Sequence, residues 1–409
     1  MLPDSAVSMC RRVLGNLLLL TATLATLLLA GEVAARLALR HLTTTADFTS
    51  YFARRWRAAA VRLNRAGFRE RELSPAAPPG SYRIAVVGDS FAYGQGVAAD
   101  ERFSNLLERR LNAGGGHRYE VLNFGRPGAE TVDEVEMLRA DVLPARPDFV
   151  LLQWFVNDVE GHDKRGRPRP VPLLPFAPAR YLLQRTSALY FLASSEWYRL
   201  QTRAGFFEGW GPAYAAYMRR RFADPASPDS RAAERALSEL VELVQGREHR
   251  LVGIVLFPDL GTDLADGYPF AYLHDRVLEL CERRGIPCLD LRPALAPHAG
   301  PRLWVNALDP HPGPLAHRLA AERLLAVFGP AWQRRATAGR PRLTPEQFPA
   351  PRAGVASFPD PAEAVSPRST SRRHQWRTSS SLVVLRSRPR TSACARRSRR
   401  RDTSNPRSS

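Results

Sequence analysis

Five short apolar runs in the middle of the chain are rich in Val, Ile and Leu and show little alternation with polar residues. Runs of this kind are typical of strands that are buried on both faces of a parallel sheet. We therefore predict strands at Arg83–Val87, Tyr119–Asn123, Phe149–Trp154, Arg250–Phe257 and Ile286–Leu291.

Apolar residues recur with helical spacing between and after these runs. The corresponding helices are predicted at Asp100–Asn112, Thr131–Leu143, Arg231–Gln245, Tyr272–Arg284 and Leu315–Phe328. The alternation of strands and helices indicates an α/β domain over residues 81–335, with helices on both faces of a parallel sheet. The stretch at 170–228 breaks the alternation with amphipathic, aromatic sequence, so we predict a helical insertion there.

The N-terminus has a different pattern, an uninterrupted apolar run. Residues 13–31 contain no charge and are bracketed by Arg12 and Glu32. A helix of this length just crosses a bilayer core of about 30 Å. We predict one transmembrane signal-anchor at 1–40 and a connector at 41–80; a cleaved signal peptide is the alternative. The large domain that follows the run favours export of that domain to an extracytoplasmic location. The positive-inside signal gives weaker support to this orientation, because arginines also follow the run.

The net charge of the 409-residue chain is +19, from 59 Lys+Arg and 40 Asp+Glu. Much of this excess is at the C-terminus, where residues 366–409 contain 13 Arg, 12 Ser and one acid, Asp402. Such a composition cannot build a core, so we predict a disordered Arg/Ser/Pro-rich tail at 336–409. Nucleic-acid or membrane binding by this tail is the alternative, but it lacks a folded, aromatic-basic module. The four cysteines form no Cys/His cluster, and no metal or cofactor is expected.

Polar residues follow three of the predicted strands. The tetrapeptide Gly88–Phe91 (GDSF) follows the first strand, a loop containing Gly128 follows the second, and Asn157 follows the third. The carboxyl ends of parallel strands form the edge at which open α/β sheets bind ligands. A hydroxyl, a loop N–H and an amide would meet there, and Asp309 and His311 near the end of the domain could reach the same place. Acyl transfer needs this set of a nucleophile, a base with an orienting acid, and oxyanion donors.

Four sequence blocks in this order resemble those of the SGNH (GDSL-type) hydrolases. The blocks are GDSF at 88–91, NFGRPGAET at 123–131, VND at 156–158 and DPHP at 309–312. A GFR segment at 67–69 resembles one found upstream of the first block in a membrane-anchored subgroup. The resemblance covers residues 68–330 and implies a flavodoxin-like α/β/α fold and an esterase activity.

The resemblance also implies a role for each block. Ser90 would attack an ester carbonyl, His311 would accept the hydroxyl proton, and Asp309 would orient the imidazole. The N–H groups of Ser90 and Gly128, with the side-chain amide of Asn157, would form the oxyanion hole.

Two departures from the family pattern affect these assignments. Phe155 stands where the third block usually has Gly, which is expected to reshape the pocket wall. Asp309 lies two residues before His311, whereas the family usually has three, so Asp290 is a rival for the orienting acid.

Other residues near these blocks have structural interpretations. Asp89 is read as structural, since Asp and Ser also cap helices. We read His317 as a surface or core histidine and Asp290 as a turn or cap residue. Cys281 and Cys288 flank a helix-to-strand turn, where a disulfide and two buried thiols are both open.

The sequence thus predicts a membrane-anchored, exported serine esterase of the SGNH type, acting on an O-acyl ester of a carbohydrate or lipid. One alternative is an O-acyltransferase or deacetylase of a cell-envelope polysaccharide, which would use the same site with a different acceptor. Another is a non-catalytic binding protein on the same fold, against which the intact Ser90, Asn157 and His311 argue. No nucleic-acid partner is expected.

Overall fold

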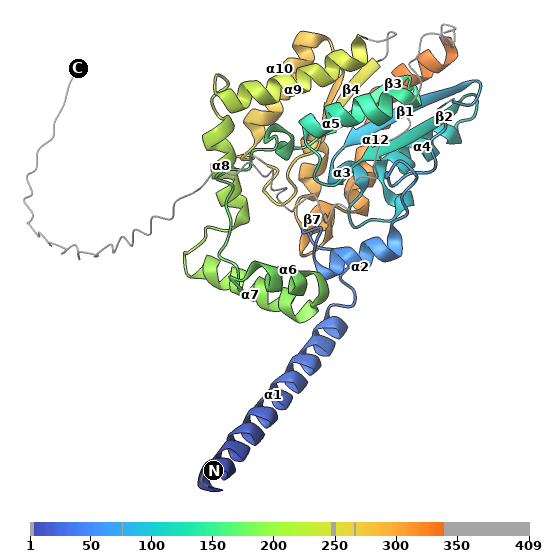
Figure 1. The fold of residues 1–409 in the computed structure, drawn as a ribbon. Helices are drawn as coiled ribbons and strands as arrows, with labels where there is room; N and C mark the ends of the chain where they lie inside the picture. The colour runs from blue at the N-terminus through green and yellow to red at the C-terminus, as the bar shows by residue number, and fades with distance from the viewer. Residues whose placement is uncertain (1–3, 76, 247–250, 266, 339–409) are drawn as a thin grey trace, which may run out of the picture. The chain divides into compact units, whose positions relative to one another are not determined.

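A five-stranded parallel sheet forms the centre of the protein (Figure 1). The computed structural model describes residues 4–75, 77–246, 251–265 and 267–338. The strand order is β2-β1-β3-β4-β5, as in a flavodoxin-like sheet. The strands are β1 (Ser81–Gly88), β2 (Arg118–Gly125), β3 (Phe149–Trp154), β4 (Leu251–Leu256) and β5 (Cys288–Asp290).

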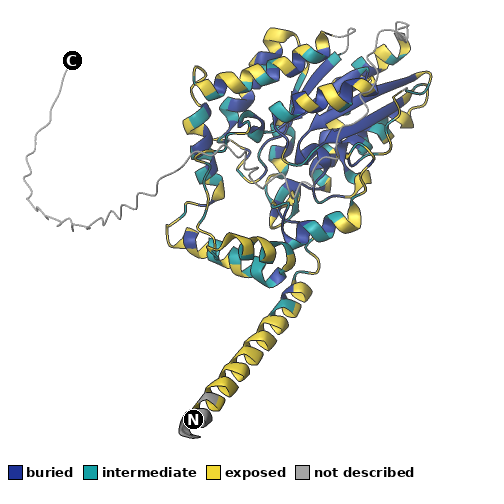
Figure 2. Ribbon diagram, in the orientation of Figure 1, coloured by how far each residue is buried: buried dark blue, intermediate teal, exposed yellow. Residues whose placement is uncertain are grey.

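The predicted strands and the α/β fold are confirmed, with small changes at the ends. Every residue of β1 and β3 is buried, which explains why their sequences are mostly apolar and show no alternation with polar residues (Figure 2). The last strand is shorter than predicted, since pairing with β4 begins only at Cys288. Pro287, the residue before it, has no N–H to donate and contributes only its carbonyl, to Ile254 N–H.

Helices lie on both faces of this sheet (Figure 1). The helices in the predicted places are α4 (Phe103–Ala113), α5 (Thr131–Met137), α9 (Pro228–Gln245), α10 (Ala271–Arg284) and α12 (Pro314–Ala338). α4 packs on α12, and α5 packs on α9. The helix predicted at 131–143 is regular only to Met137 and continues as a π turn over Leu138–Val142. Three short elements near the end of the domain are α11 (Arg292–Leu295) and the antiparallel pair β6 (Trp304–Asn306) and β7 (Asp309–Pro312).

Three further helices occupy the predicted insertion. They are α6 (Ala177–Thr186), α7 (Ala188–Arg203) and α8 (Trp210–Phe222). α7 contacts the C-terminal part of α1 (Asp4–Ala38), and both α6 and α7 contact α2 (Tyr51–Ala60). The insertion is therefore joined to the N-terminal segment as well as to the α/β domain.

The apolar run predicted at the N-terminus lies within α1. Its part Arg11–Ala38 is long and apolar enough to cross a membrane, with a mean hydropathy of 2.1 and none of its most apolar window buried. A signal sequence near an N-terminus has the same properties. The tail predicted at 336–409 lies outside the described residues, apart from the last turn of α12.

Candidate active site

Ser90 begins a short helix directly after β1. The N-cap of this helix, α3 (Ser90–Tyr93), is Asp89, whose carboxylate accepts a hydrogen bond from Phe91 N–H at 2.8 Å. The N-cap interpretation of Asp89 therefore agrees with the structure. Gly88 is required at the end of β1, because a Cβ there would collide with the side chain of Gln153.

Gln153 on β3 fixes this strand-to-helix turn. Its Oε1 accepts hydrogen bonds from Asp89 N–H at 3.2 Å and from Ala92 N–H at 2.9 Å. Two donors at the start of α3 are thus satisfied by one side chain, which holds the backbone around Ser90 in place.

Ser90, His311 and Asp309 form a continuous hydrogen-bonded chain. Ser90 Oγ lies 3.0 Å from His311 Nε2, and His311 Nδ1 lies 2.5 Å from Asp309 Oδ1. Asp309 Oδ1 also accepts from the backbone N–H of His311 at 3.2 Å. All three residues are buried, Asp309 fully. The two-residue spacing in β7 is therefore sufficient to bring the carboxylate to the imidazole.

The charges around His311 favour the protonated ring. Burial works to lower the pKa of His311, but the charge and hydrogen bond of Asp309 outweigh it, so the pKa is raised. Asp89 and Asp259 add to this effect. Asp259 lies just after β4, and burial raises its pKa to about 6.

The predicted oxyanion donors lie in the segments that follow β1, β2 and β3. Within the described part of the chain, the N–H groups of Ser90 and Gly128 donate to no protein group. Gly128 has φ +77°, a left-handed conformation that favours glycine. The Asn157 side chain lies close enough to Asp89 to lower the pKa of that carboxyl group. Among the described residues, Asn157 Oδ1 has no hydrogen-bond partner.

Three buried carboxyl groups surround the start of α3. Asp89 has a pKa raised to about 6, chiefly by burial. Burial also raises the pKa values of Glu134 and Asp158 well above their usual range, and the neighbouring carboxylates add to the effect. Asp158 accepts from Phe155 N–H, whereas neither carboxyl oxygen of Glu134 has a partner among the described residues.

Aromatic side chains form the walls beside the imidazole. Phe155, at the position where the family usually has Gly, packs on Phe91 with ring centroids 4.3 Å apart. Phe91 and Phe48 each lie edge-on to His311, with centroids 5.6 Å and 5.7 Å away. Phe48 comes from the connector after α1, to which the sequence assigned no role in the site.

Asp290 and His317 lie elsewhere in the fold. Asp290 Oδ1 is 3.2 Å from His274 Nδ1 and caps Arg292 N–H at 2.8 Å. His317 is fully buried against Phe103 and accepts its N–H at 3.2 Å, and burial lowers the pKa of His317 to about 3. Both arrangements agree with the structural interpretations made from sequence.

The sequence analysis missed three residues of the site region, which are Gln153, Asp259 and Phe48. Gln153 is the one polar residue in an otherwise apolar strand, which could have marked it. Asp259 follows the fourth strand at the same edge of the sheet as the other blocks. Phe48 has no local signal, because its contact with His311 joins residues distant in sequence.

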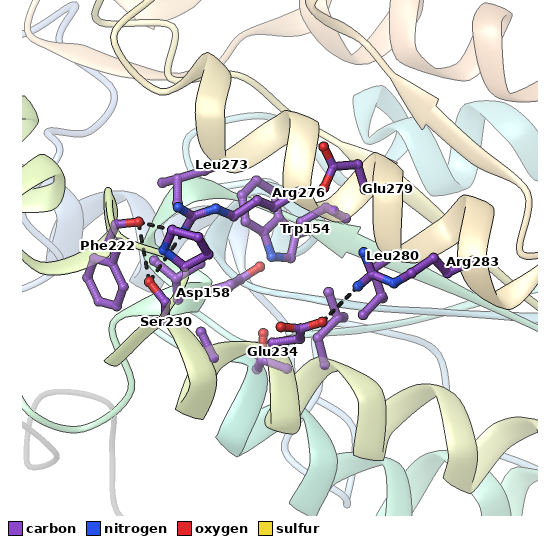
Figure 3. Close-up of a pocket in the computed structure, with 16 residues that line it drawn as sticks. Trp154, Asp158, Phe222, Ser230, Glu234, Leu273, Arg276, Glu279, Leu280 and Arg283 are labelled. Carbon is purple, nitrogen blue, oxygen red and sulfur yellow. Dashed lines mark hydrogen bonds and ion pairs between the residues drawn. The ribbon is translucent and has the colours of Figure 1, made fainter. Parts of the chain in front are cut away.

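Among the described residues, no group of three or more His, Cys, Asp or Glu side chains is placed to hold a metal ion. A cavity of about 150 Å³ lies between α9, α10 and the end of β3 (Figure 3). Its lining includes Asp158 but none of Ser90, Asp309 or His311, and ion pairs such as Arg283–Glu234 cross its rim. We therefore do not count it as part of the site.

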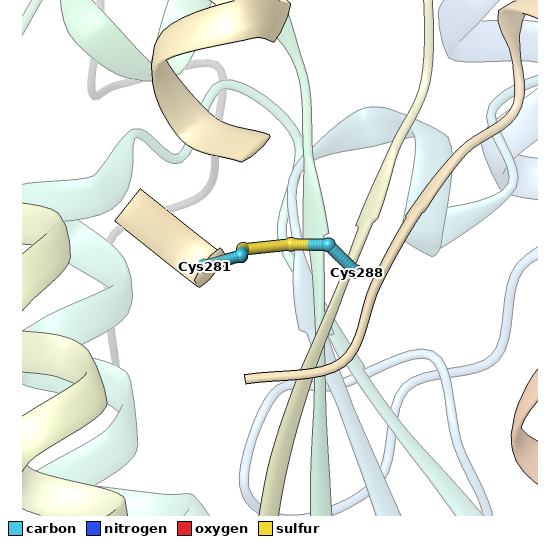
Figure 4. The surroundings of a disulfide bond; sticks show 2 residues. All are labelled: Cys281 and Cys288. Atoms are coloured by element: carbon cyan, nitrogen blue, oxygen red, sulfur yellow. A yellow bond between two sulfur atoms is a disulfide. The ribbon is translucent and has the colours of Figure 1, made fainter. Parts of the chain in front are cut away.

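Cys281 and Cys288 form a disulfide (Figure 4). The bond links the end of α10 to the first residue of β5, and so decides between the two states left open by the sequence.

Comparison with solved structures finds lipolytic proteins at low sequence identity and low TM-score. One is a putative lipolytic protein of the G-D-S-L family from Desulfitobacterium hafniense DCB-2, with 14% identity, 60% of this chain and 98% of that chain covered, and a TM-score of 0.37. Another is the lipase/acylhydrolase from Enterococcus faecalis, with 16% identity, 61% and 96% coverage, and a TM-score of 0.37. No curated protein is similar enough to count as a match.

The family assignment rests instead on a sequence model. The model of the GDSL-like lipase/acylhydrolase family matches residues 86–319, more than half of the chain. This region contains all four blocks and ends in α12. The chain is a hydrolase acting on ester bonds, and it belongs to the GDSL-like lipase/acylhydrolase family.

Proposed function

We propose that the protein is a serine esterase that hydrolyses O-acyl esters, with Ser90 as nucleophile, His311 as base and Asp309 as orienting acid. The observation that supports this most directly is the hydrogen-bonded chain from Asp309 through His311 to Ser90. The base touches the nucleophile on one side and the acid on the other, as acyl transfer requires.

The chemistry follows from this order. Ser90 Oγ attacks the ester carbonyl while its proton passes to His311 Nε2, and Asp309 stabilises the imidazolium that forms. The carbonyl oxygen becomes an oxyanion, which the N–H groups of Ser90 and Gly128 and the amide of Asn157 bind. His311 then returns the proton to the leaving alcohol, and an acyl group remains on Ser90. A water molecule, activated by the same imidazole, releases the acid.

We further propose that α1 anchors the protein and that the domain is exported. Residues 11–30 of α1 are exposed, so no other described part of the protein covers them. A disulfide between Cys281 and Cys288 is the state expected in an oxidising compartment.

The test compares wild type with Ser90→Ala on a panel of p-nitrophenyl esters of increasing acyl length. The variant is expected to lose turnover while keeping the wild-type melting temperature. A fluorophosphonate probe should label the wild type at Ser90 and leave the variant unlabelled. Labelling at another serine, with turnover retained, would refute the assignment.

A further inference from the structure

We propose that the helix pair α6–α7 rests on the surface of the same bilayer that α1 crosses, and that its exposed apolar side chains enter the lipid interface. The proposal rests on the anchoring of α1 proposed above. We call residues 171–209, which comprise α6, α7 and their flanking turns, the interfacial hairpin.

The first argument is the attachment of the hairpin to the end of the apolar run. Glu32, the first charged residue after that run, caps the N-terminus of α7. Its carboxylate accepts from Ser187 Oγ at 2.6 Å and from the N–H groups of Ala188 and Leu189 at 3.0 Å. A residue at this depth lies where the bilayer core ends, so the first turn of α7 is held at the membrane boundary.

A second contact strengthens the attachment. Arg36, one turn after Glu32, bonds to Glu32 at 2.6 Å and donates to Thr186 O, the last residue of α6, at 3.0 Å. The Glu32–Arg36 ion pair on α1 therefore supplies hydrogen-bond partners to backbone groups at the end of α6 and at the start of α7. Figure 1 shows the two helices side by side next to the C-terminal end of α1.

The second argument is the distribution of exposed apolar side chains. Ten large ones are exposed outside α1 among the described residues, and six of these lie in the interfacial hairpin. The six are Val171, Phe176, Tyr181, Leu182, Leu200 and Phe206. Phe206 is 83% exposed, Phe176 67% and Leu182 61%. Such a concentration in 39 residues marks a surface that a partner covers.

The composition of the hairpin favours lipid as that partner. It has four arginines against two glutamates, and its exposed apolar residues include Phe, Tyr and Leu. Helices that lie in a membrane interface combine apolar and aromatic residues on one face with Arg or Lys beside them. The partner that covers these side chains is then the surface of the bilayer that α1 crosses, and no second protein is needed.

The hairpin is also connected to the active site. Gln184 of α6 donates to Thr49 Oγ1 at 3.0 Å and to the carboxylate of Asp47. Phe48, between these two residues, lies against His311. The bilayer-facing helices thus hold the loop that contacts the base.

The test places single NBD labels on the full chain in bilayers that contain doxyl lipids. The background replaces Cys10 and Cys394 with Ser, and labels are placed by Leu182→Cys, Phe206→Cys, Leu20→Cys and Val327→Cys. Val327 is the matched control, since it is an exposed apolar residue on α12. Shallow doxyl lipids should quench the labels at 182 and 206 at least about twofold more than the label at 327, because interfacial helices enter lipid by about 5–10 Å. A melting curve of each labelled protein checks its fold.

The label at 20 separates the two proposals. If it is quenched by deep doxyl lipids while the labels at 182 and 206 behave like the one at 327, the anchor stands and the interfacial hairpin is refuted. If the label at 20 is not quenched either, the anchoring fails and the hairpin proposal falls with it. Neither result bears on Ser90, whose role the ester panel tests.

Discussion

Phe48 lies edge-on to His311, with ring centroids 5.7 Å apart and the ring planes at 64°. The loop that carries Phe48 joins α1 to α2, so the N-terminal segment supplies part of the wall around the proposed base. The same loop is held by Gln184 of the insertion. The connector therefore contacts the imidazole directly, and the insertion reaches it only through this loop.

Removing Phe48 should loosen the imidazole without changing the charges around it. Phe48→Ala is expected to lower kcat roughly two- to tenfold, because an edge-to-face aromatic contact contributes about 0.5–1.5 kcal/mol. The acid limb of the pH–rate profile should move only slightly, toward higher pH, because no charged group is lost and less burial raises the pKa of His311. Leu63→Ala, at a residue that is 53% exposed and lies outside the interfacial hairpin, is the control and should leave both quantities unchanged. A Phe48→Ala protein with wild-type kcat would show that the contact does not position His311.

Asp309 should govern both the rate and its pH dependence. Its charge raises the pKa of His311, against the opposing effect of burial. Catalysis needs the neutral imidazole, so activity falls as pH falls through this pKa. Asp309→Asn is expected to shift the acid limb to lower pH and to reduce kcat steeply, by a factor of up to about 10⁴.

The control for this prediction is Asp290→Asn. Asp290 is paired with His274 and caps α11, so its loss should leave the pH–rate profile of the esterase in place. A small loss of kcat in Asp309→Asn, together with a large loss of kcat in Asp290→Asn, would show that Asp290 and not Asp309 is the orienting acid.

The fold was predictable because its signals are local. Runs such as Phe149–Trp154, which are apolar except for Gln153, mark strands buried on both faces, and the structure has β3 at this same range. The start of β5 was less predictable, because Pro287 removes a donor that a hydropathy pattern does not register.

The candidate site was predictable from two kinds of signal, polar residues that follow a strand and the DPHP block that contains Asp309 and His311. Ser90, Gly128 and Asn157 stand after three neighbouring strands, and parallel strands deliver their ends to one edge. Phe48 and Glu134 could not be found in this way. Phe48 reaches the site from a connector, and the burial of Glu134 depends on how α5 packs, which the sequence of one helix does not define.

The disulfide between Cys281 and Cys288 should stabilise the folded protein, because it closes a short loop in the unfolded chain. Cys281 and Cys288 lie seven positions apart in the sequence, and closing a loop of this size destabilises the unfolded chain by about 2–3 kcal/mol. Cys281→Ser should therefore lower the melting temperature by several degrees. Reducing the wild type should lower it by a similar amount and should have no further effect on the variant. An equal effect of the reductant on both proteins would mean that the bond is not responsible.

Glu134 should make stability depend on pH. Burial raises the pKa of this carboxyl group well above its usual range, and neither of its oxygens has a partner among the described residues. The folded state therefore keeps a proton that the unfolded state loses, so unfolding becomes easier as pH rises above the usual carboxyl range. A difference of one pKa unit between the folded and unfolded states corresponds to about 1.4 kcal/mol in the free energy of unfolding. Glu134→Gln has no proton to lose, and its melting temperature should exceed that of wild type by a few degrees more at about pH 8 than at about pH 5. Glu136→Gln, exposed on the same helix, should show no such difference. Thermal melts of the three proteins at both pH values decide it, and parallel curves for wild type and Glu134→Gln would show that Glu134 does not retain its proton in the folded protein.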